Sequence, residues 1–405
     1  MSEWKEYRLS EIVDKFAMGP FGSNIKAENF TNSGVPVIRG TNLNYNKYVD
    51  GEFVFLTEEK AEELKSSFCY PGDLVFTHRG TIGQVGLIPY GKFPRYIISQ
   101  SGMKLTVNPK LLDNNFLYYF FKSSIGQFEL LKHESQVGVP SISSPLTALK
   151  SVKLRIPPLK GQKQITILLS ALDDKIGLLQ KQNRILESLT ETIFRRWFIE
   201  EINKKVDAIV LGDYVSVVNG CSYKSSELNP SSNALITLKS FKRNGGFRID
   251  GYKEFTGKIN EKQIVKQGDL IVAHTDITQE AEIVGNPALV VANSRYKNLV
   301  ISMDLVKVNC ENSLLNIPFL YFLMRTPEFK SHCVGFTNGT TVLHMNKSAI
   351  PTFEFLKPDF RKVKLFEIET MSYLKKIFTN IHQIRALNSI RDILLPKLLS
   401  GEVTI

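Results

Sequence analysis

Four short motifs in the first half of the chain recur in the second half, in the same order and about 200 residues later. The matching pairs are Leu9–Glu11 with Leu211–Asp213, Gly72–Val75 with Gly268–Ile271, Phe116–Phe120 with Phe319–Leu323, and Ile156–Pro158 with Leu356–Pro358. Each match alone is weak, because short runs such as Gly-Asp-Leu are common after turns. The shared order and offset predict a chain made of two copies of one two-part unit.

Each copy opens with a stretch of about 150 residues that mixes short strands, turns and a few helices. Strands are expected where β-branched residues are bounded by Gly, Pro or Asn, at Val35–Arg39, Asp73–Thr77, Gln84–Ile88, Leu235–Leu238, Asp269–Ala273 and Leu299–Val308. Asn115–Lys122 and Pro318–Met324 have the composition of short aromatic helices. These patterns predict a compact α/β domain with a mostly antiparallel or mixed, curved sheet in each copy.

Each copy then ends in a long helix with a heptad pattern. After Pro158, isoleucine or leucine occupies every seventh position, at Ile165, Leu172, Leu179, Leu186 and Ile193. The residues expected between them in the seam are Leu168, Leu169, Ile176, Asn183, Leu189 and Trp197. The second helix is expected to begin near Asp359 and to end at Pro396 and Gly401. Its expected seam residues are Val363, Phe366, Met371, Leu374, Ile377, Ile381, Ile384, Leu387 and Leu394. Such a repeat predicts coiled-coil pairing.

Two heptad helices in one duplicated chain can satisfy each other by pairing antiparallel. The expected fold class is therefore α+β, with two α/β domains separated by two long helices that form an antiparallel coiled coil and a pseudo-twofold duplication. The expected boundaries are 1–157 for the first domain, 158–203 for the first helix, 204–357 for the second domain and 358–405 for the second helix. Asn183 and Asn388 occupy matching seam positions, where they either fix the register or lie exposed at the seam edge.

The net charge of +11 over 405 residues favours a polyanionic partner. The excess is divided evenly, since residues 1–206 carry 27 basic and 21 acidic side chains and residues 207–405 carry 24 and 19. The amino terminus lacks the apolar segment of a signal peptide, and no window approaches the roughly 18 apolar residues of a membrane span. The four cysteines show no metal-ligand spacing. We expect a cytoplasmic protein with one basic unit written twice.

Motifs for catalysis are missing from the sequence. No phosphate-binding Gly-x-x-x-x-Gly-Lys-Ser/Thr run occurs. A methyltransferase would need a glycine-rich cofactor turn and an Asn/Asp-Pro-Pro-aromatic run, and Asn286–Ala288 lacks both. Asp359, Glu367 and Glu369 could suggest the carboxylate cluster of a nuclease. No lysine follows them at the spacing that a nuclease needs, so Pro358 and Asp359 are interpreted as the start of a helix. We therefore expect no enzymatic activity, no cofactor and no metal.

The chain resembles the specificity subunit of type I restriction–modification systems over essentially its whole length. The motifs that carry the resemblance are GPFGSNIK at 19–26, GVPVIRGTNL at 34–43, RGTIGQVG at 79–86, IPPLKGQKQI at 156–165, TETIFRRWF at 190–198, TDITQEAEIVG at 275–285 and IRDILLPKLLSGEV at 390–403. The last of these is the most diagnostic. The family's usual helix opening has Glu before the Gln, whereas this chain has Gly161-Gln162.

The resemblance implies a protein with two target recognition domains, each of which reads one half of a bipartite, asymmetric sequence in double-stranded DNA. It implies that the two long helices set the spacer and recruit two methyltransferase subunits. It also implies that restriction subunits complete the endonuclease, and that the specificity subunit has no catalytic activity and no membrane partner. The alternative is a structural coiled-coil DNA-binding scaffold outside restriction–modification.

Polar, basic or glycine-rich turns between strands are the candidates for DNA contact. Arginine can bond to guanine and Asn or Gln to adenine, whereas lysine contacts phosphate. The first-domain candidates are Arg39, Thr41, Asn42, Arg79, Thr81, Gln136 and Ser141. The second-domain candidates are Lys239, Arg243, Asn244, His274, Thr275, Asp276, Asn338, Thr340, Thr341, His344, Asn346 and Lys347. The candidates for methyltransferase contact, expected to be exposed near the helix ends, are Arg195, Arg196, Trp197, Phe198 and Lys397. The alternative for each is a solvated turn or helix end.

Overall fold

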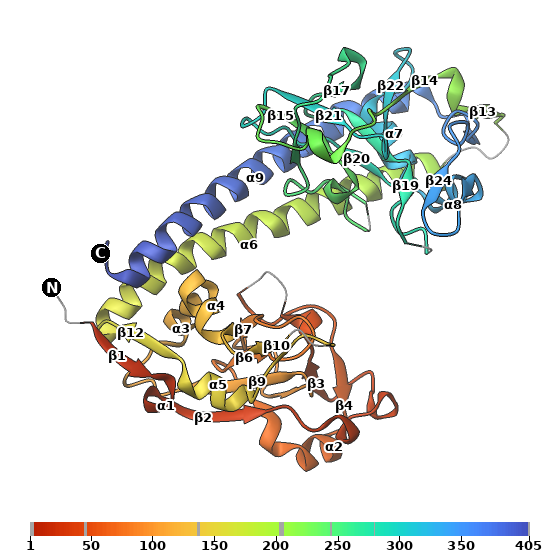
Figure 1. The fold of residues 1–405 in the computed structure, drawn as a ribbon. Coiled ribbons are helices and arrows are strands. Elements are labelled where there is room, and N and C mark those ends of the chain that lie inside the picture. The colour runs from red at the N-terminus through yellow and green to blue at the C-terminus, as the bar shows by residue number, and fades with distance from the viewer. Residues whose placement is uncertain are drawn as a thin grey trace. The chain divides into compact units, whose positions relative to one another are not determined.

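The computed structural model describes residues 4–43, 47–135, 138–201, 206–243, 245–278 and 280–403. The chain divides into two compact units, the first formed by Met1–Lys181 with Ile381–Ile405 and the second by Gln182–Asn380. Each unit therefore joins one sheet-rich region to parts of both long helices (Figure 1).

Two four-stranded sheets form the centre of the first unit. One has the antiparallel order β2 (Val13–Met18), β9 (Gly102–Val107), β6 (Leu74–Thr77), β7 (Val85–Leu87). The other has the order β4 (Val54–Leu56), β3 (Val35–Ile38), β8 (Tyr96–Ile98), β5 (Phe68–Cys69), with β3 and β8 parallel. Two ribbons pair β1 (Lys5–Arg8) with β12 (Lys153–Ile156) and β10 (Glu134–Ser135) with β11 (Ser141–Ile142). The short helices are α1 (Leu9–Ile12), α2 (Glu58–Glu63), α3 (Asn114–Lys122), α4 (Ser124–Leu131) and α5 (Pro145–Ser151).

The second unit repeats this topology sheet by sheet. Its antiparallel sheet has the order β14 (Val215–Asn219), β22 (Leu305–Cys310), β18 (Leu270–Ala273), β20 (Pro287–Leu289). Its mixed sheet has the order β16 (Lys253–Glu254), β15 (Asn233–Ile236), β21 (Asn298–Ile301), β17 (Ile264–Val265), with β15 and β21 parallel. The smaller sheets are β13 (Ala208–Val210) with β25 (Glu354–Leu356), and β19 (Thr275–Asp276) with β24 (Leu343–Met345) and β23 (Thr337–Asn338). The helices are α7 (Ile317–Leu323) and α8 (Pro327–Gly335). The duplication predicted from the sequence is confirmed.

The single strand predicted over Leu299–Val308 is wrong, because this segment forms two strands in different sheets. Strand β21 pairs with β15, and β22 pairs with β14 and β18. Between them, the Leu305 N–H donates to the Ser302 carbonyl (2.9 Å), which closes a tight turn. A continuous apolar run hides such a turn, because both strands are buried.

The repeated Gly-Asp-Leu motif has a structural cause. Asp73 accepts hydrogen bonds from the Tyr70 N–H (2.9 Å) and the Thr106 hydroxyl (2.6 Å), and it forms an ion pair with Lys104 (2.7 Å). In the second unit, Asp269 pairs with Lys307 in the same way (2.8 Å). The aspartate thus closes the turn before β6 or β18 and fixes it to the neighbouring strand.

The two long helices are α6 (Leu159–Arg195), which continues into a π-helical turn over Arg196–Glu200, and α9 (Phe360–Ser400). Asp359 caps the start of α9 by accepting from the Arg361 N–H (2.9 Å). Pro396 lies inside α9, so the expected end at that residue is wrong. Gly401 follows the last helical residue with a φ of 78°, a left-handed conformation that suits glycine and ends the helix.

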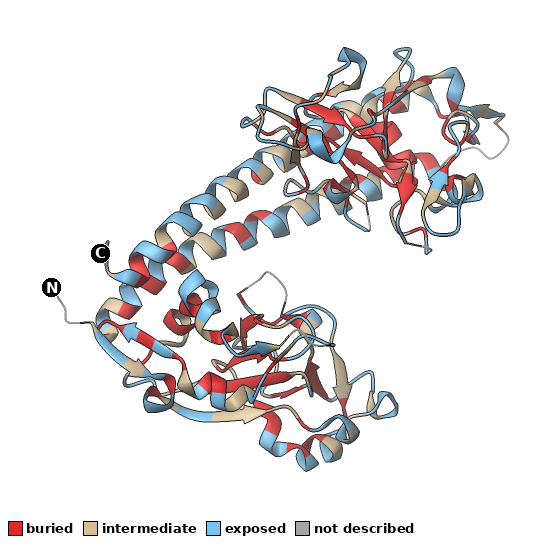
Figure 2. Cartoon of the chain, viewed as in Figure 1, coloured by how far each residue is buried: buried red, intermediate tan, exposed pale blue. Residues whose placement is uncertain are grey.

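Opposite ends of the two helices meet within each unit. In the first unit, Ile165 near the start of α6 shares a core with Leu398 near the end of α9. In the second, Phe194 near the end of α6 packs against Phe366 near the start of α9, with ring centroids 5.8 Å apart. The helices are therefore antiparallel in both units, as the heptad pattern predicts. Figure 2 shows buried and intermediate residues alternating with exposed ones along both helices.

Three of the expected seam residues lie outside the seam. Leu168, Leu189 and Met371 are 37%, 43% and 48% exposed. Leu169, which was also expected in the seam, is buried, as are Thr190 and Thr370, because the second row of each seam falls four residues after the first. Asn183 and Asn388 are both half-buried, and Asn183 accepts at its side-chain oxygen from the amide of Asn380 (2.7 Å). The seam thus carries a buried amide at a position that the heptad count did not identify.

A tyrosine on each short aromatic helix bonds to a carboxylate on α6, and the same carboxylate accepts from an arginine. In the first unit, the Tyr119 hydroxyl donates to Asp173 (2.8 Å), which also accepts from Arg391 (3.0 Å). In the second unit, Glu187 accepts from the Tyr321 hydroxyl (3.3 Å) and from Arg325 (2.8 Å). These contacts fix each sheet-rich region to the helix that follows or precedes it.

Candidate nucleic-acid interface

Three loops of the first unit meet at the end of β6. The His78 N–H donates to the Ser101 carbonyl, and the His78 carbonyl accepts from the Ile142 N–H, both at 2.9 Å. The Gly80 N–H donates to the Pro140 carbonyl (2.9 Å). Backbone bonds therefore hold the turn after β6, the turn before β9 and the strand β11 in one cluster, which contains several of the predicted DNA-contact residues.

A fourth loop, the GPFGSN segment at 19–24, packs onto the same cluster. Gly19 lies so close to Ser99 that a Cβ atom there would be 1.8 Å from the Ser99 carbonyl oxygen. Gly220 makes the same approach to Ser302 in the second unit, at 2.0 Å. Phe21 in this loop is 86% exposed, and sequence reasoning did not select it as a contact residue. An aromatic residue in a glycine-rich run between strands was the available signal.

The candidates of the first unit differ in how accessible they are. Arg79, Thr81 and Thr41 are exposed, and Ser141 is half-buried. Arg39 is also half-buried, although its Nε atom is buried. Asn42 is a correction, because it is 1% exposed and its amide donates to the carbonyls of Asp50 (3.2 Å) and Glu52 (2.9 Å). Its side chain holds the following loop and is not available to DNA. Gln136 lies outside the described residues.

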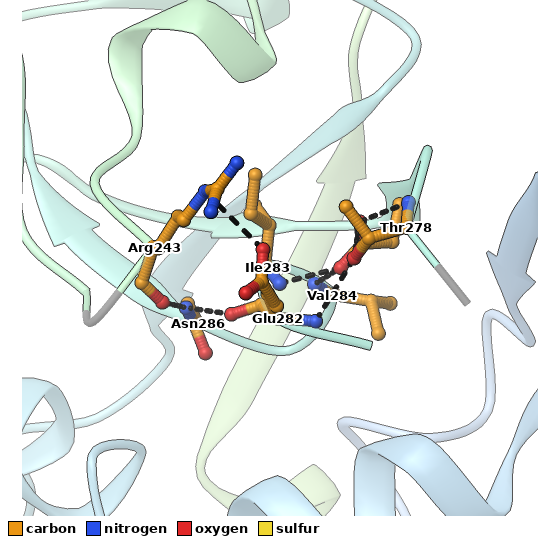
Figure 3. Close-up of polar contacts among 7 residues, drawn as sticks. Arg243, Thr278, Glu282, Ile283, Val284 and Asn286 are labelled. Carbon is orange, nitrogen blue, oxygen red and sulfur yellow. Dashed lines mark hydrogen bonds and ion pairs between the residues drawn. The ribbon is translucent and has the colours of Figure 1, made fainter. Parts of the chain in front are cut away.

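The turn after β18 in the second unit is organised around a buried carboxylate (Figure 3). Asp276 accepts from the N–H and hydroxyl of Thr278 (both 2.8 Å), from the N–H of Val284 (2.9 Å) and from the N–H of Ile283. Burial would raise the pKa of Asp276, but the backbone hydrogen bonds outweigh it and hold the pKa below its ordinary value. Asp276 was predicted to contact DNA, and this is a correction, since the side chain is buried and saturated.

Thr275, beside it, is a second correction. Its side chain is buried, and its hydroxyl donates to Asp304 (3.1 Å), on the turn between β21 and β22. Thr275 therefore fastens two turns together, and the exposed surface of this loop is formed by its neighbours, such as Ile277.

Arg243 is exposed beside this loop and forms an ion pair with Glu282 (3.2 Å; Figure 3). Its backbone is held in place, because the Arg243 carbonyl accepts from the Asn286 amide (2.9 Å), and Asn286 in turn accepts from Lys330 (2.8 Å). Lys239 is also exposed. Arg243 is thus an exposed arginine on a fixed backbone. Asn244 lies outside the described residues.

The hairpin of β23 and β24 brings the remaining second-unit candidates beside the turn after β18. His344 pairs with Thr275 across β24 and β19. The candidates that are exposed on or next to this hairpin are Asn338, Thr340, Thr341, His344, Asn346 and Lys347. His274 is half-buried, and its Nε2 is buried without a hydrogen-bond partner. Burial, with His344 and Lys347 nearby, lowers the pKa of His274.

The candidates for partner contact at the end of α6 separate into two groups. Arg195 and Arg196 are exposed and form ion pairs with Glu200 and Glu201, both at 2.9 Å. Phe198 is a correction, because it is 6% exposed and packs on Phe319 with centroids 4.9 Å apart. Trp197 is half-buried in the same aromatic cluster. Lys397, near the end of α9, is exposed.

Across the described ranges, no three His, Cys, Asp or Glu side chains gather in a group that could hold a metal ion. Nor, within those ranges, is any helix both long enough and apolar enough to cross a membrane.

Comparison with known proteins agrees with this architecture. Residues 1–188 match the family model of the type I restriction modification DNA specificity domain. The chain is 23% identical to the specificity subunit of the type I restriction enzyme HindI from Haemophilus influenzae, with all of both chains covered. It is 25% identical to the MjaIX specificity subunit from Methanocaldococcus jannaschii, with all of this chain and 94% of that one covered. A crystal structure of a type I S subunit from M. genitalium shares its fold, with a TM-score of 0.59 and 15% identity over 98% of this chain and 96% of that one. The chain is therefore similar, over its whole length, to the DNA specificity subunits of type I restriction–modification systems.

Proposed function

We propose that this chain is the DNA-reading subunit of a type I restriction–modification complex, and that its two sheet-rich regions read different halves of a bipartite, asymmetric target. The observation that carries the proposal is that one topology occurs twice with different turns at the same place. The turn between β6 and β7 covers residues 78–84, whereas its counterpart between β18 and β20 covers residues 274–286. Two readers with one scaffold and unlike contact loops suit two unlike half-sites.

The paired helices support a fixed distance between the half-sites. Helix α6 has 37 residues, which corresponds to about 55 Å at the usual rise of about 1.5 Å per residue. One turn of DNA is roughly 34 Å long. A helix of this length is sufficient to carry two recognition domains to positions about one DNA turn apart, so we propose that the helices set the length of the non-specific spacer.

Exposed apolar side chains on both helices support the recruitment of methyltransferase subunits. In the first unit these are Ile167, Leu178, Ile390 and Ile393, and in the second they are Ile185, Leu189, Leu365 and Ile368. The chain's own core leaves these side chains exposed, and apolar patches of this kind are typical of protein interfaces. We propose two bound methyltransferase subunits, one for each repeat, to which restriction subunits add. Arg195, Arg196 and Lys397 are the charged candidates beside these faces.

In this proposal the chain itself is not a catalyst and acts in the cytoplasm, where the DNA and the other subunits are found. The alternative, a coiled-coil DNA-binding scaffold outside restriction–modification, is disfavoured by the whole-length similarity to type I specificity subunits. A scaffold also has no need for two recognition surfaces with different loops.

The test is to reconstitute the full chain with its methyltransferase subunit and to map methylated bases across a genome. A single bipartite motif with unlike halves and a constant gap is the expected result. Ile167→Glu, at an exposed helix residue, serves as a matched variant. This variant chain should no longer bind the methyltransferase subunit, but it should still bind DNA. Methylation without a common motif, or methylation by the methyltransferase alone at the same sites, contradicts the proposal.

A further inference from the structure

One arginine of the first unit is recessed and carries an unneutralised charge. Arg39 follows β3, and its Nε is buried without a hydrogen-bond partner. Among the described residues, no ion pair joins Arg39 to a carboxylate, whereas Arg95 of the same unit pairs with Glu58 and Glu62. A buried donor without an acceptor destabilises a fold, so its presence asks for an explanation.

The Arg39 side chain borders a hollow of about 210 Å³. Ile25, Phe30 and Val37 line its apolar side, where the methylene stem of an arginine can pack. Ser99, Gln100 and Ser101 line its polar side. The hollow therefore combines one cation with hydroxyl and amide donors, which are groups that bind phosphate oxygens.

The polar wall of the hollow is held in place by close backbone contacts. The Ser99 N–H donates to the Ile38 carbonyl (2.9 Å), so the wall is joined to the strand that precedes Arg39. Gly19 lies against the Ser99 carbonyl, and a Cβ on Gly22 would be 2.5 Å from the Gln100 side-chain oxygen. The hollow is thus part of the cluster of loops described above.

Depth decides which part of DNA can reach Arg39. The edges of stacked bases lie inside a groove, so a side chain that reads them must protrude, as Arg79 and Arg243 do. Phosphates are the outermost groups of the duplex and can enter a shallow hollow to meet a recessed guanidinium. The Ser99 and Ser101 hydroxyls lie 3.3 Å apart and bond to each other, so one hydroxyl proton of the pair can turn to a ligand. A recessed cation with an unpartnered Nε beside these hydroxyls therefore matches a backbone phosphate and not a base edge.

We propose that the Arg39 hollow binds a phosphodiester of the DNA backbone at the half-site read by the first unit. This inference rests on the DNA-reading function proposed above and assigns Arg39 to setting register, separate from the reading of bases. At the equivalent position of the second unit, the residue after β15 is Thr237, a buried side chain that caps its own turn by accepting from the Lys239 N–H (3.3 Å). The two units would therefore contact the DNA backbone differently at this position.

The test measures the salt dependence of DNA binding by the full chain. Arg39→Met, Arg39→Lys and, as a matched control, Arg95→Met are titrated against a short random-sequence duplex and against the duplex that carries the methylated motif. The slope of log K against log salt is negative, and losing one phosphate contact reduces its magnitude by about 0.9. We expect this decrease for Arg39→Met on both duplexes, and an unchanged slope for Arg39→Lys and Arg95→Met. The thermal midpoint of Arg39→Met should equal or exceed that of the parent chain, because the variant removes the buried, unpartnered donor.

Three outcomes overturn the inference. An unchanged slope in a folded Arg39→Met chain excludes a phosphate contact. A change in the methylated motif at one base of the first half-site assigns Arg39 to base reading. A thermal shift caused by inorganic phosphate and lost in Arg39→Met, with an unchanged DNA slope, assigns the hollow to a free phosphate-bearing molecule. Failure of the proposed restriction–modification function would appear instead as the absence of a methylation motif, and the slope on random-sequence DNA would still be informative.

Discussion

Replacing Asp276 by asparagine should destabilise the turn after β18, because it removes hydrogen bonds that hold the turn. The carboxylate accepts three backbone N–H groups and one hydroxyl, so both of its oxygens are occupied. An amide offers one oxygen, and in either orientation its amino group points at a backbone N–H. A hydrogen bond to a charged group contributes about 1.5–3 kcal/mol and a neutral one about 1. Losing one bond and weakening the others should lower the free energy of unfolding by about 3 kcal/mol.

Urea denaturation and hydrogen exchange provide the assay. Asp276→Asn should lower the unfolding midpoint and speed exchange at the amides of Ile283 and Val284. The control is Asp250→Asn, whose carboxylate is exposed and paired only at the surface with Arg248, so its loss should cost less than about 1 kcal/mol. Equal midpoints for Asp276→Asn and the parent chain, with normal protection of both amides, would refute the reasoning.

The same carboxylate gives a pH dependence with a defined sign. The folded-state pKa of Asp276 lies below its ordinary value, which is about 3.9 in an unfolded chain. Its contribution is therefore fully present above the unfolded pKa and is lost as the pH falls through the folded pKa. The stability difference between the parent chain and Asp276→Asn should be constant from about pH 6 to 8 and should shrink below about pH 4.

Three further predictions concern the scaffold. Lys104→Met should cost about 3–5 kcal/mol of unfolding free energy, because it leaves the Asp73 carboxylate, which is 3% exposed, without its cation. Lys307→Met should cost only about 1 kcal/mol, because its partner Asp269 is 27% exposed. Equal losses in denaturation experiments would contradict this. Asn380→Leu should raise the thermal midpoint, since the Asn380 side-chain oxygen is buried without a partner, while the half-buried Asn388→Leu should change it less, and a lower midpoint for Asn380→Leu would count against the seam argument. Inserting seven residues after Lys181 and seven after Asn380 lengthens each helix by about 10 Å and should lengthen the spacer by about three base pairs in a methylation map, whereas an active complex with an unchanged gap would exclude the helices as a ruler.

The repeat and the helices could be predicted because they depend on patterns that burial imposes on sequence. The Gly-Asp-Leu runs, the aromatic helices and the heptads each recur because each copy must close the same turns and fill the same core. The errors within them have a common cause. Leu168, Leu189 and Met371 are apolar but lie outside the seam, and the apolar pattern alone does not reveal which of two neighbouring rows is buried.

The candidate site could be predicted only at the level of loops. The turns after β3, β6, β15 and β18 were selected as candidates for DNA contact, and backbone bonds join several of them near the strand ends, but their contact with DNA stays a prediction. The role of each polar residue was not predictable, because Asn42, Thr275 and Asp276 use the same chemical groups to cap backbone atoms that a contact residue uses to bind DNA. Depth also separated Arg39 from Arg79, and depth follows from tertiary packing.

The most direct test of the central claim, that one chain carries two independent half-site readers, is a methylation map after exchange of residues 1–157 for those of a relative with a different target. The account predicts a new sequence in one half of the motif, with the other half and the gap unchanged. Changes in both halves, or an unchanged motif in an active complex, would contradict it.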